Sequence, residues 1–591
     1  MRFRLSQLSK RHRYALTALF LSLIFLLGIG IGCLSGHGFS ENSEFQSFAK
    51  ELFKNEVSGN TLTLHYTLAD PEAFGISGQK ASLGTMDTDT DSTRKLCKDY
   101  LHKLKAFDSH RLSRQNNITL DTLLLYFHTQ LEGLENPYLD EPLGPSLGIQ
   151  AQLPVLLAEY AFHQEQDITD YLNLLADIPS YFDSILEYEK QKSQTGLFMS
   201  DAMLDRIQAQ CRSFIQDPDS NYMLSVFAQK LDTLETLSDA DKSHLSQVHR
   251  QILIRKVIPA YQALINGLEA FRGTGRESCG LSHYPGGTDY YCYLLKSQTG
   301  VYEPIAQIRK RLLTQLQKDS AEVSALAAIH PSLLTDYAKG TGTDFPSLAP
   351  QKALIFLQDC MQKDFPSLGK TSYQIRYVHK SMEKYLSPAF YLTPPIDTKE
   401  PNVIYINQAA STTQLELFTT LAHEGFPGHL YQTQYFSKLD PDPVRSLFDS
   451  SGYVEGWATY VESYAYQYAA TLINHEDAES LTRLTALNRS INLCLYSLVD
   501  IGIHYQGWSS AQTADFLKNF GIRDASAVSQ IYQYITETPG NYLKYYVGYL
   551  NFLDLKDEAQ KENPEAFDLK QFHSQVLQIG PVPFPVLKKY L

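Results

Sequence analysis

Apolar residues recur at helical spacing through much of the chain. Between about residues 94 and 390, two stretches each carry a single apolar stripe whose members lie three or four positions apart. The stripes are Leu172, Leu175, Ile178, Phe182 and Ile185, and then Leu253, Val257, Tyr261, Leu264 and Leu268. Such a stripe covers one face of an amphipathic helix and packs that face on a core. The pattern predicts a predominantly α-helical body, and no repeat of fixed period indicates a solenoid.

One short stretch departs from the helical pattern. Residues 402–407 alternate β-branched and other side chains after a proline-rich approach, which predicts a strand. Thr413 and Glu416 follow with the spacing of a capping box, so a helix is expected to open there. If the strand is an edge strand beside that helix, an extended peptide can pair with it through backbone hydrogen bonds. The alternative is a strand that only covers the core.

The first 36 residues form a separate targeting segment. Residues 14–34 are uncharged and largely apolar, and five basic residues precede them, namely Arg2, Arg4, Lys10, Arg11 and Arg13. A positive flank stays in the cytoplasm, so the rest of the chain is expected outside the cytoplasmic membrane. The run is long enough to anchor the protein as a spanning helix. Two alternatives stay open: lipidation of Cys33, as in a lipoprotein, or cleavage and secretion.

Length and charge limit the domain organisation and the partners. With 591 residues the chain can form a large core, and no long linker interrupts residues 37–591. We expect one helical domain there, undivided or in two lobes around a cleft, with its catalytic motifs in residues 389–591. The net charge of −14 argues against a nucleic-acid partner, because phosphate groups are neutralised by a basic surface. The oligomeric state is left open.

Seven cysteines are present, and export permits disulfides. Cys279 and Cys292 bracket a loop rich in Gly and Pro, which makes them the best candidates for a pair. For the other cysteines beyond Cys33, buried thiols are an equally good interpretation.

The stretch HEGFPGH at residues 423–429 carries the most chemical information. Its two histidines are six positions apart, so on a straight helix the second would point roughly 120° away and lie about 9 Å further along. Pro427 cannot donate to the carbonyl of His423, and Gly425 and Gly428 relax the backbone on either side. The helix is therefore expected to kink or end there and to bring His429 back toward His423. Two imidazoles so placed can bind one zinc ion.

Two carboxylates are expected to complete this site. Glu424 directly follows the first histidine, where a glutamate acts as the general base rather than as a ligand. Glu455 is the candidate for the third protein ligand, because it begins an apolar, aromatic helical stretch 26 residues after His429. Asp449 is a weaker candidate, and Glu462, two turns beyond Glu455, is placed to hydrogen-bond a ligand histidine. The alternative for Glu455 is a carboxylate stabilised by the start of its helix.

Several motifs together resemble a known bacterial family. TLAHEGFPGHLYQ (residues 420–432) and EGWATYVE (455–462) are similar to domain-of-unknown-function family number 885, as are AFYLTPP (389–395), DIGIHYQGW (500–508) and ETPGNYLKYYVG (537–548). The resemblance covers most of the chain after about residue 45. It implies a zinc metallopeptidase with a HEGxPGH signature, and a large helical body like that of the deep-cleft oligopeptidases of the Glu-zincin type. One small β-sheet would lie beside the zinc-motif helix.

The resemblance also implies two catalytic residues outside the metal motif. Tyr545 matches the family pattern PGxxxxYxxG, and together with His504 it would polarise the scissile carbonyl. Asp500 is four positions before His504 on a helical pattern, so its carboxylate can orient the imidazole. Without the resemblance, Tyr545 is interpreted as a packing residue in a chain rich in tyrosine. The loop at residues 280–291, with its tyrosines, is expected to shape the substrate pocket. The alternative is a surface loop held by a bond between Cys279 and Cys292.

The expected function is that of an exported, membrane-associated peptidase with one zinc ion per chain, acting on short peptides. One alternative is a non-catalytic, membrane-tethered binding protein on an inherited fold, which the intact Glu424 argues against. The other is a zinc hydrolase of non-peptide amides, which uses the same machinery. The sequence leaves open endo- versus exo-cleavage, the side-chain preference, and which Arg or Lys meets a substrate carboxylate.

Overall fold

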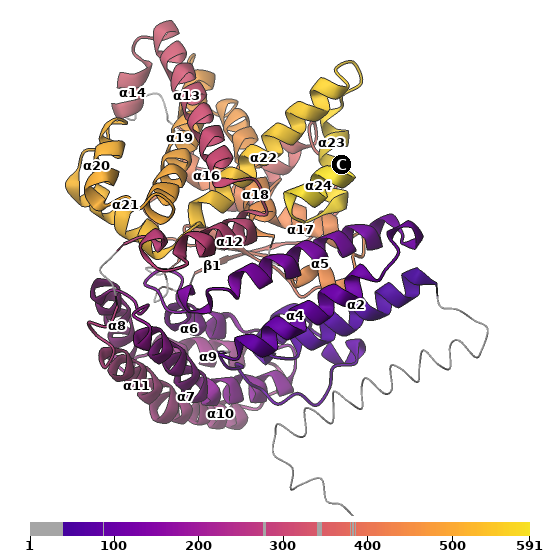
Figure 1. Cartoon of the computed structure of the whole chain (residues 1–591), viewed down its shortest axis with the longest axis vertical. Helices are drawn as coiled ribbons and strands as arrows, with labels where there is room; N and C mark the ends of the chain where they lie inside the picture. Colours follow the sequence, from indigo (N-terminus) through magenta and orange to yellow (C-terminus); the bar gives the residue numbers. More distant parts are fainter. Residues whose placement is uncertain are drawn as a thin grey trace, which may run out of the picture.

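Helices make up most of the described part of the protein (Figure 1). The computed structural model describes residues 40–591 except for positions 87, 276–278, 340–344, 379, 381, 382, 384, 385 and 449. The expected targeting segment with Cys33, and also Asp449, therefore lie outside the described residues. Among the helices that are described, none combines the length and the apolar character needed to cross a membrane.

The first helices form a layer that runs along one side of the molecule in Figure 1. They enclose a hydrophobic cluster of their own, which includes Phe45, Phe53, Leu104 and Phe127. The helices of this layer are α2 (Glu41–Val57), α3 (Thr61–Thr67), α4 (Thr90–Lys105) and α5 (Arg114–Gly133).

The next helices gather into a bundle at the lower left of Figure 1, which we call the α6–α11 bundle. Every member of the two predicted apolar stripes is buried in its core. The first stripe lies on α7 and the second runs from a π-helical turn into α11, so both helical predictions are confirmed. The members of the bundle are α6 (Ile149–Glu159), α7 (Glu165–Gln194), α8 (Asp201–Ile215), α9 (Tyr222–Asp232), α10 (Asp239–Ile252), η5 (Leu253–Val257) and α11 (Ile258–Glu269).

The remaining helices surround the largest hydrophobic cluster. Two of them, α18 and α22, cross at unusually close range, since a Cβ on Gly456 would lie 2.6 Å from the Cα of Gly548. Glu455 directly precedes Gly456, and Tyr545 lies about one turn before Gly548. Both residues therefore lie on helices that pack closely against each other. The helices are α12 (Gly287–Thr299), α13 (Ile305–Ile329), α14 (Leu333–Lys339), α15 (Pro350–Met361), α16 (Gln414–Glu424), α17 (His429–Ser437), α18 (Ser451–Ala470), α19 (Ala478–His504), α20 (Ser510–Lys518), α21 (Ala525–Glu537), α22 (Asn541–Glu562), α23 (Leu569–Ile579) and α24 (Phe584–Tyr590).

Within the described residues, one three-stranded sheet interrupts the helices, with strand order β1-β3-β2. The strands are β1 (Gln374–Tyr377), β2 (Ala389–Leu392) and β3 (Val403–Ile406). The strand predicted at residues 402–407 is confirmed as β3. It is not an edge strand, however, because β1 pairs with it in parallel and β2 pairs with it in antiparallel orientation. The edge beside α16 belongs to β2, and the expected fold class, a large helical body with one small sheet next to the motif helix, is confirmed.

The expected disulfide is wrong, because no bond joins Cys279 to Cys292. Cys292 lies on α12, where its thiol faces the charges of Asp289 and Lys296. Cys279 precedes that helix and lies within electrostatic range of Tyr532 on α21. The loop between the two cysteines therefore directs their side chains toward different neighbours.

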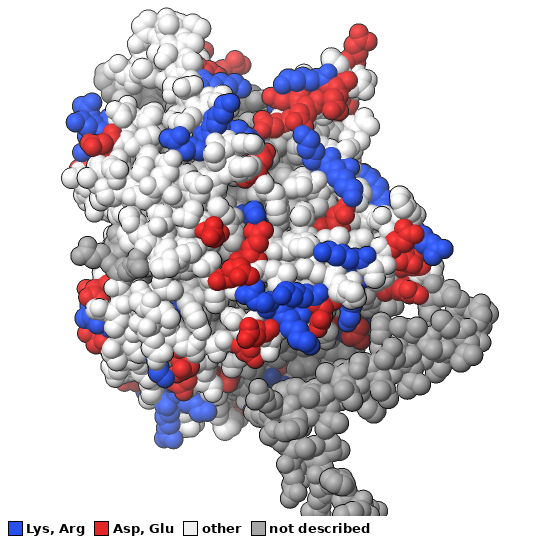
Figure 2. All heavy atoms as spheres, in the orientation of Figure 1, with Lys and Arg blue, Asp and Glu red and all other residues white. Residues whose placement is uncertain are grey.

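Charged side chains of both signs are interspersed on the face shown in Figure 2. Ion pairs at the surface include Arg311–Asp554 at 2.5 Å and Lys588–Glu558 at 2.7 Å. Exposed pairs of this kind contribute at most about 1 kcal/mol each. Such charges favour solubility more than they stabilise the fold.

Candidate metal centre

The HEGFPGH segment forms a turn between two helices. α16 opens with the predicted capping box, in which the Glu416 N–H donates to Thr413 Oγ1 and the Thr413 N–H donates to the Glu416 carboxylate. The helix ends at Glu424, and α17 begins at His429. The imidazole ring centroids of His423 and His429 lie 4.7 Å apart. The predicted break of the helix between the two histidines is confirmed.

Close backbone packing holds this turn in place. A Cβ on Gly428 would lie 1.8 Å from the carbonyl oxygen of His423, so a side chain at this position would displace the backbone. Trp457 Nε1 donates a hydrogen bond of 2.9 Å to the carbonyl oxygen of Pro427. Because Trp457 belongs to α18, this bond fixes the turn against the helix that carries Glu455.

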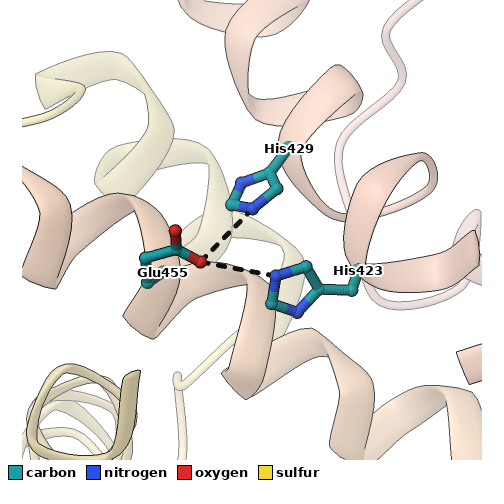
Figure 3. Close-up of side chains that lie close together, drawn as sticks. All are labelled: His423, His429 and Glu455. Carbon is teal, nitrogen blue, oxygen red and sulfur yellow. Dashed lines mark ion pairs between the residues drawn. The ribbon is translucent and has the colours of Figure 1, made fainter. Parts of the chain in front are cut away.

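His423, His429 and Glu455 point toward one shared space (Figure 3). Glu455 Oε2 lies 3.4 Å from His423 Nε2 and 3.5 Å from His429 Nε2. Ligand atoms placed about 2.0–2.2 Å from a tetrahedral zinc ion lie roughly 3.3–3.6 Å from one another. Both distances fit this geometry, and all three candidate ligand atoms lie within 4.8 Å of one another.

Glu455 Oε2 has bonding capacity that the protein does not use. This buried oxygen has no hydrogen-bond partner among the described residues. Burying a polar atom without a partner costs on the order of 1–3 kcal/mol, and more for a charged group. A cation between the three side chains would satisfy the oxygen, so the donor set fits a metal ion.

Two further residues, Glu462 and Arg489, extend the site on the Nδ1 side of His423. Its Nδ1 lies 2.8 Å from Glu462 Oε1, as the spacing from Glu455 predicts, and Arg489 Nε donates to Glu462 Oε2 at 3.3 Å. Burial alone would raise the pKa of Glu462, but the charge of Arg489 and the bond to His423 lower it to about 2. The ionised carboxylate accepts the Nδ1–H of His423, which directs the Nε2 lone pair toward the shared space.

Arg489 is a site residue that sequence reasoning missed. It comes from the middle of α19 and belongs to no recognised motif. A charged residue on a helical pattern is usually solvent-exposed, and only the packing of α19 against α18 gives Arg489 a buried carboxylate to bind.

The carboxylates around His423 favour its protonated form. Burial by itself would lower the pKa of His423, but the neighbouring carboxylates of Glu455 and Glu462 raise it to about 10. A proton and a metal ion compete for the same imidazole lone pair, so metal binding is expected to release a proton.

Glu424 and Tyr545 lie beside the cluster. Glu424 Oε2 accepts a hydrogen bond of 2.9 Å from the backbone N–H of Tyr391 in β2. The ring centroid of Tyr545 on α22 is 6.4 Å from that of His423. Burial and the charges of Glu455 and Glu424 raise the pKa of Tyr545 far above its ordinary value, so its phenol keeps its proton. Five of the six candidate site residues are thus brought together.

His504 is not brought to this cluster. It lies fifteen residues beyond Arg489 on α19, or roughly 22 Å along the helix axis. Its Nε2 lies 2.9 Å from the carbonyl oxygen of Ile535, and its Nδ1 accepts from the backbone N–H of Leu281 at 3.2 Å. The residue is only 1% exposed, and burial lowers its pKa to about 4, so the ring is neutral and both nitrogens are occupied by backbone groups.

Asp500 does not orient His504 as expected. Its carboxylate accepts hydrogen bonds from the hydroxyl of Tyr291 at 2.5 Å and from the backbone N–H of Gly540 at 2.9 Å. These bonds tie α19 to α12 and to the start of α22. The Asp500 side chain therefore positions helices rather than the imidazole.

The fold and site together define a mainly helical protein with a candidate His–His–Glu metal centre. The model of the family "Bacterial protein of unknown function (DUF885)" matches residues 72–591, and the chain belongs to this family. The resemblance seen in the motifs is thereby confirmed. None of the curated proteins matches the chain.

Two solved structures share the fold. One is a "putative lipoprotein" from Colwellia psychrerythraea, 17% identical, which matches with a TM-score of 0.78 over 94% of this chain and 99% of that one. The other is a "putative lipoprotein of unknown function" from Shewanella oneidensis, 16% identical, with a TM-score of 0.61 over 92% and 99% of the two chains. At these identities the likeness concerns the fold alone.

Proposed function

We propose that this protein is a zinc-dependent peptidase with one zinc ion per chain. The observation that carries the proposal is the convergence of His423, His429 and Glu455 at separations that suit zinc, around a buried Glu455 oxygen with no hydrogen-bond partner in the described part of the chain. Two imidazoles and one carboxylate are a common ligand set of catalytic zinc sites, which keep one position open.

The residues around the ligands suit peptide hydrolysis. A zinc ion bound there would act as a Lewis acid on a carbonyl and would lower the pKa of water. Glu424 takes the proton of the attacking water and passes it to the leaving amine. Tyr545, whose phenol stays protonated, donates to the oxyanion that develops on the scissile carbonyl. We assign no such donation to His504, because both of its ring nitrogens already have partners.

The edge strand β2 is suited to bind an extended peptide. The Asn407 N–H donates to the carbonyl oxygen of Pro388, so alternate residues from Pro388 onward face β3. Ala389 and Tyr391 consequently direct their backbone groups to the outer edge, where the Tyr391 N–H meets Glu424. A peptide strand added at this edge would run beside the general base. We therefore assign to β2 the pairing with an extended peptide that the sequence suggested for β3.

We also propose that the peptidase acts outside the cytoplasmic membrane and is attached to it. The basic flank and apolar run at the N-terminus support export, and Cys33 offers a lipidation site, although a spanning helix is an alternative anchor. The two structures that share the fold are each named as putative lipoproteins, which agrees with this placement.

The test combines metal analysis with hydrolysis. The full chain, purified in detergent, is expected to hold about one zinc ion, measured by elemental mass spectrometry. Glu424→Gln should keep the zinc and lose at least about 100-fold in the rate of short-peptide hydrolysis. The exposed Glu562→Gln serves as the matched control and should keep full activity.

Two results would contradict the proposal. Absence of bound zinc after reconstitution would favour a tethered binding protein without catalysis. A zinc-loaded protein that cleaves acyl-amino acids but no peptide would make it a hydrolase of non-peptide amides.

A further inference from the structure

A cavity of about 400 Å³ separates the α6–α11 bundle from the C-terminal helices. In Figure 1, α8 lies below α12 and α21, and residues of all three helices line the cavity. Its walls mix polar residues with apolar and aromatic ones, which include Met203 from the bundle, Leu281 and Tyr290 around the start of α12, and Tyr532 from α21. A volume and lining of this kind suit a small organic ligand or the end of a peptide.

Lys544 on α22 is the cation of this cavity without an ion-pair partner among the described residues. Two of the cavity's carboxylates are already neutralised, since Glu141 pairs with Lys192 and Glu537 pairs with Arg206. A charge that the protein leaves unpaired in a cavity is available for a ligand.

Lys544 places one side of the cavity near the candidate metal centre. Lys544 Nζ lies 5.4 Å from the ring centroid of Tyr545, which in turn lies 6.4 Å from that of His423, so Lys544 Nζ is no more than about 12 Å from the His423 ring. One residue of an extended peptide spans about 3.3–3.6 Å. A group bound by Lys544 would therefore sit one to three residues from a bond that is cleaved at the metal.

Two features determine which anion suits the cavity. The start of α22, at Asn541, also lines it, and the positive end of a helix dipole favours a negative charge there. The third carboxylate of the cavity, Asp140, lies with Leu139 on its wall and disfavours a second negative group. One carboxylate beside Lys544 meets both conditions.

We infer that this cavity binds the C-terminal end of a short peptide substrate, with Lys544 paired to the main-chain carboxylate. The inference rests on the proposed peptidase function and adds to it the position of cleavage, which is one to three residues from the C-terminus. A carboxylate on the last side chain of a peptide has the same chemistry, so the test separates the two sources.

Three peptides of one sequence test the inference on the zinc-loaded full chain: the free acid, the C-terminal amide, and the amide with Glu as its last residue. The free acid is expected to have a kcat/KM about tenfold or more above that of the amide, mainly through KM, because a hydrogen-bonded charge pair forms on binding. Lys544→Met should abolish this difference while keeping its zinc content and melting temperature. Lys561→Met, an exposed lysine on the same helix, should retain the difference.

Equal rates for the acid and the amide would overturn the inference, as would a preference that survives in Lys544→Met. If the Glu-ending amide is cleaved as well as the free acid, the main chain is not the group recognised, and the C-terminal assignment is wrong.

If the protein cleaves none of the peptides, binding of the same peptides to the Glu424→Gln variant is measured by calorimetry. If Glu424→Gln binds the free acid more tightly than the amide, and if the additional Lys544→Met substitution removes this preference, the cavity assignment is upheld although the peptidase proposal fails. Equal binding of the acid and the amide would overturn the cavity assignment itself.

Discussion

Two buried polar clusters include residues of α19. Both contain a histidine and a carboxylate, but these groups play different roles in each. At Arg489, a chain of ion pairs leads through Glu462 to His423 and ends at the Glu455 oxygen, which has no hydrogen-bond partner among the described residues. At the C-terminal end of the helix, Asp500 and His504 bind groups of neighbouring segments that need partners themselves. In both clusters the histidine and the carboxylate come from recognisable motifs. Unused bonding capacity, rather than residue type, distinguishes the candidate ligand site from the structural network.

The largest effect is expected from removing one histidine from each cluster, which tests whether only the first cluster binds zinc. His423→Ala should reduce the zinc content from about one ion per chain to near zero, because a catalytic zinc site depends on each of its three protein ligands. His504→Ala should leave the zinc content near one. Elemental mass spectrometry after dialysis measures both, and zinc loss in the His504 variant would show that the clusters are coupled.

A smaller effect is expected from the carboxylate behind the ligand histidine. Glu462→Gln should weaken zinc binding about 10–100-fold, because the neutral amide no longer holds the Nδ1–H of His423 as firmly. Competition with a chromophoric chelator measures the affinity, and the exposed Glu565→Gln is the control. An unchanged zinc affinity would mean that Glu462 only fills space.

The second cluster should respond in stability instead of in metal binding. His504→Gln is expected to lower the free energy of unfolding by about 1–3 kcal/mol, because the backbone N–H of Leu281 and the carbonyl of Ile535 lose a well-placed partner. Urea denaturation at neutral pH measures the change. A variant with native stability but lower peptidase activity would reinstate His504 as a catalytic residue.

The second cluster should also show a pH dependence of stability, which comes from Asp500. Burial raises its pKa to about 7 in the folded protein, above its value of 3.8 in an unfolded chain, even though hydrogen bonds from Tyr291 and Gly540 oppose the rise. The folded state then holds a proton that the unfolded state releases, so this contribution to stability is complete below pH 4 and is lost as the pH rises to about 7.

Asp500→Asn should remove this dependence of the free energy of unfolding on pH. Urea denaturation at pH 5 and pH 8 is expected to show the wild type losing more stability with rising pH than the Asn variant loses. Other titrating groups are common to both proteins and cancel in the difference. Parallel pH profiles would show that Asp500 stays ionised throughout this range.

Much of the local structure was determined by the sequence itself. The apolar stripes of α7 and α11, the capping box at Thr413 and the break between the two motif histidines all follow from residues within a few positions of one another. Backbone sterics and hydrogen bonding act over that range, so spacing alone predicts them. The grouping of His423, His429, Glu424, Glu455 and Tyr545 in one site also agrees with the family resemblance.

Tertiary structure decided what each polar group meets. β3 became the central strand because β1 and β2, the two strands that precede it in the chain, pair on both of its sides. Arg489 reached Glu462, His504 was surrounded by backbone groups, and Lys544 was left facing a cavity, through packing between helices far apart in sequence. These outcomes depend on how faces of different helices meet, and no local pattern specifies that. The sequence therefore determined which groups have reactive chemistry, and the packing of the helices decided which of them remain available to use it.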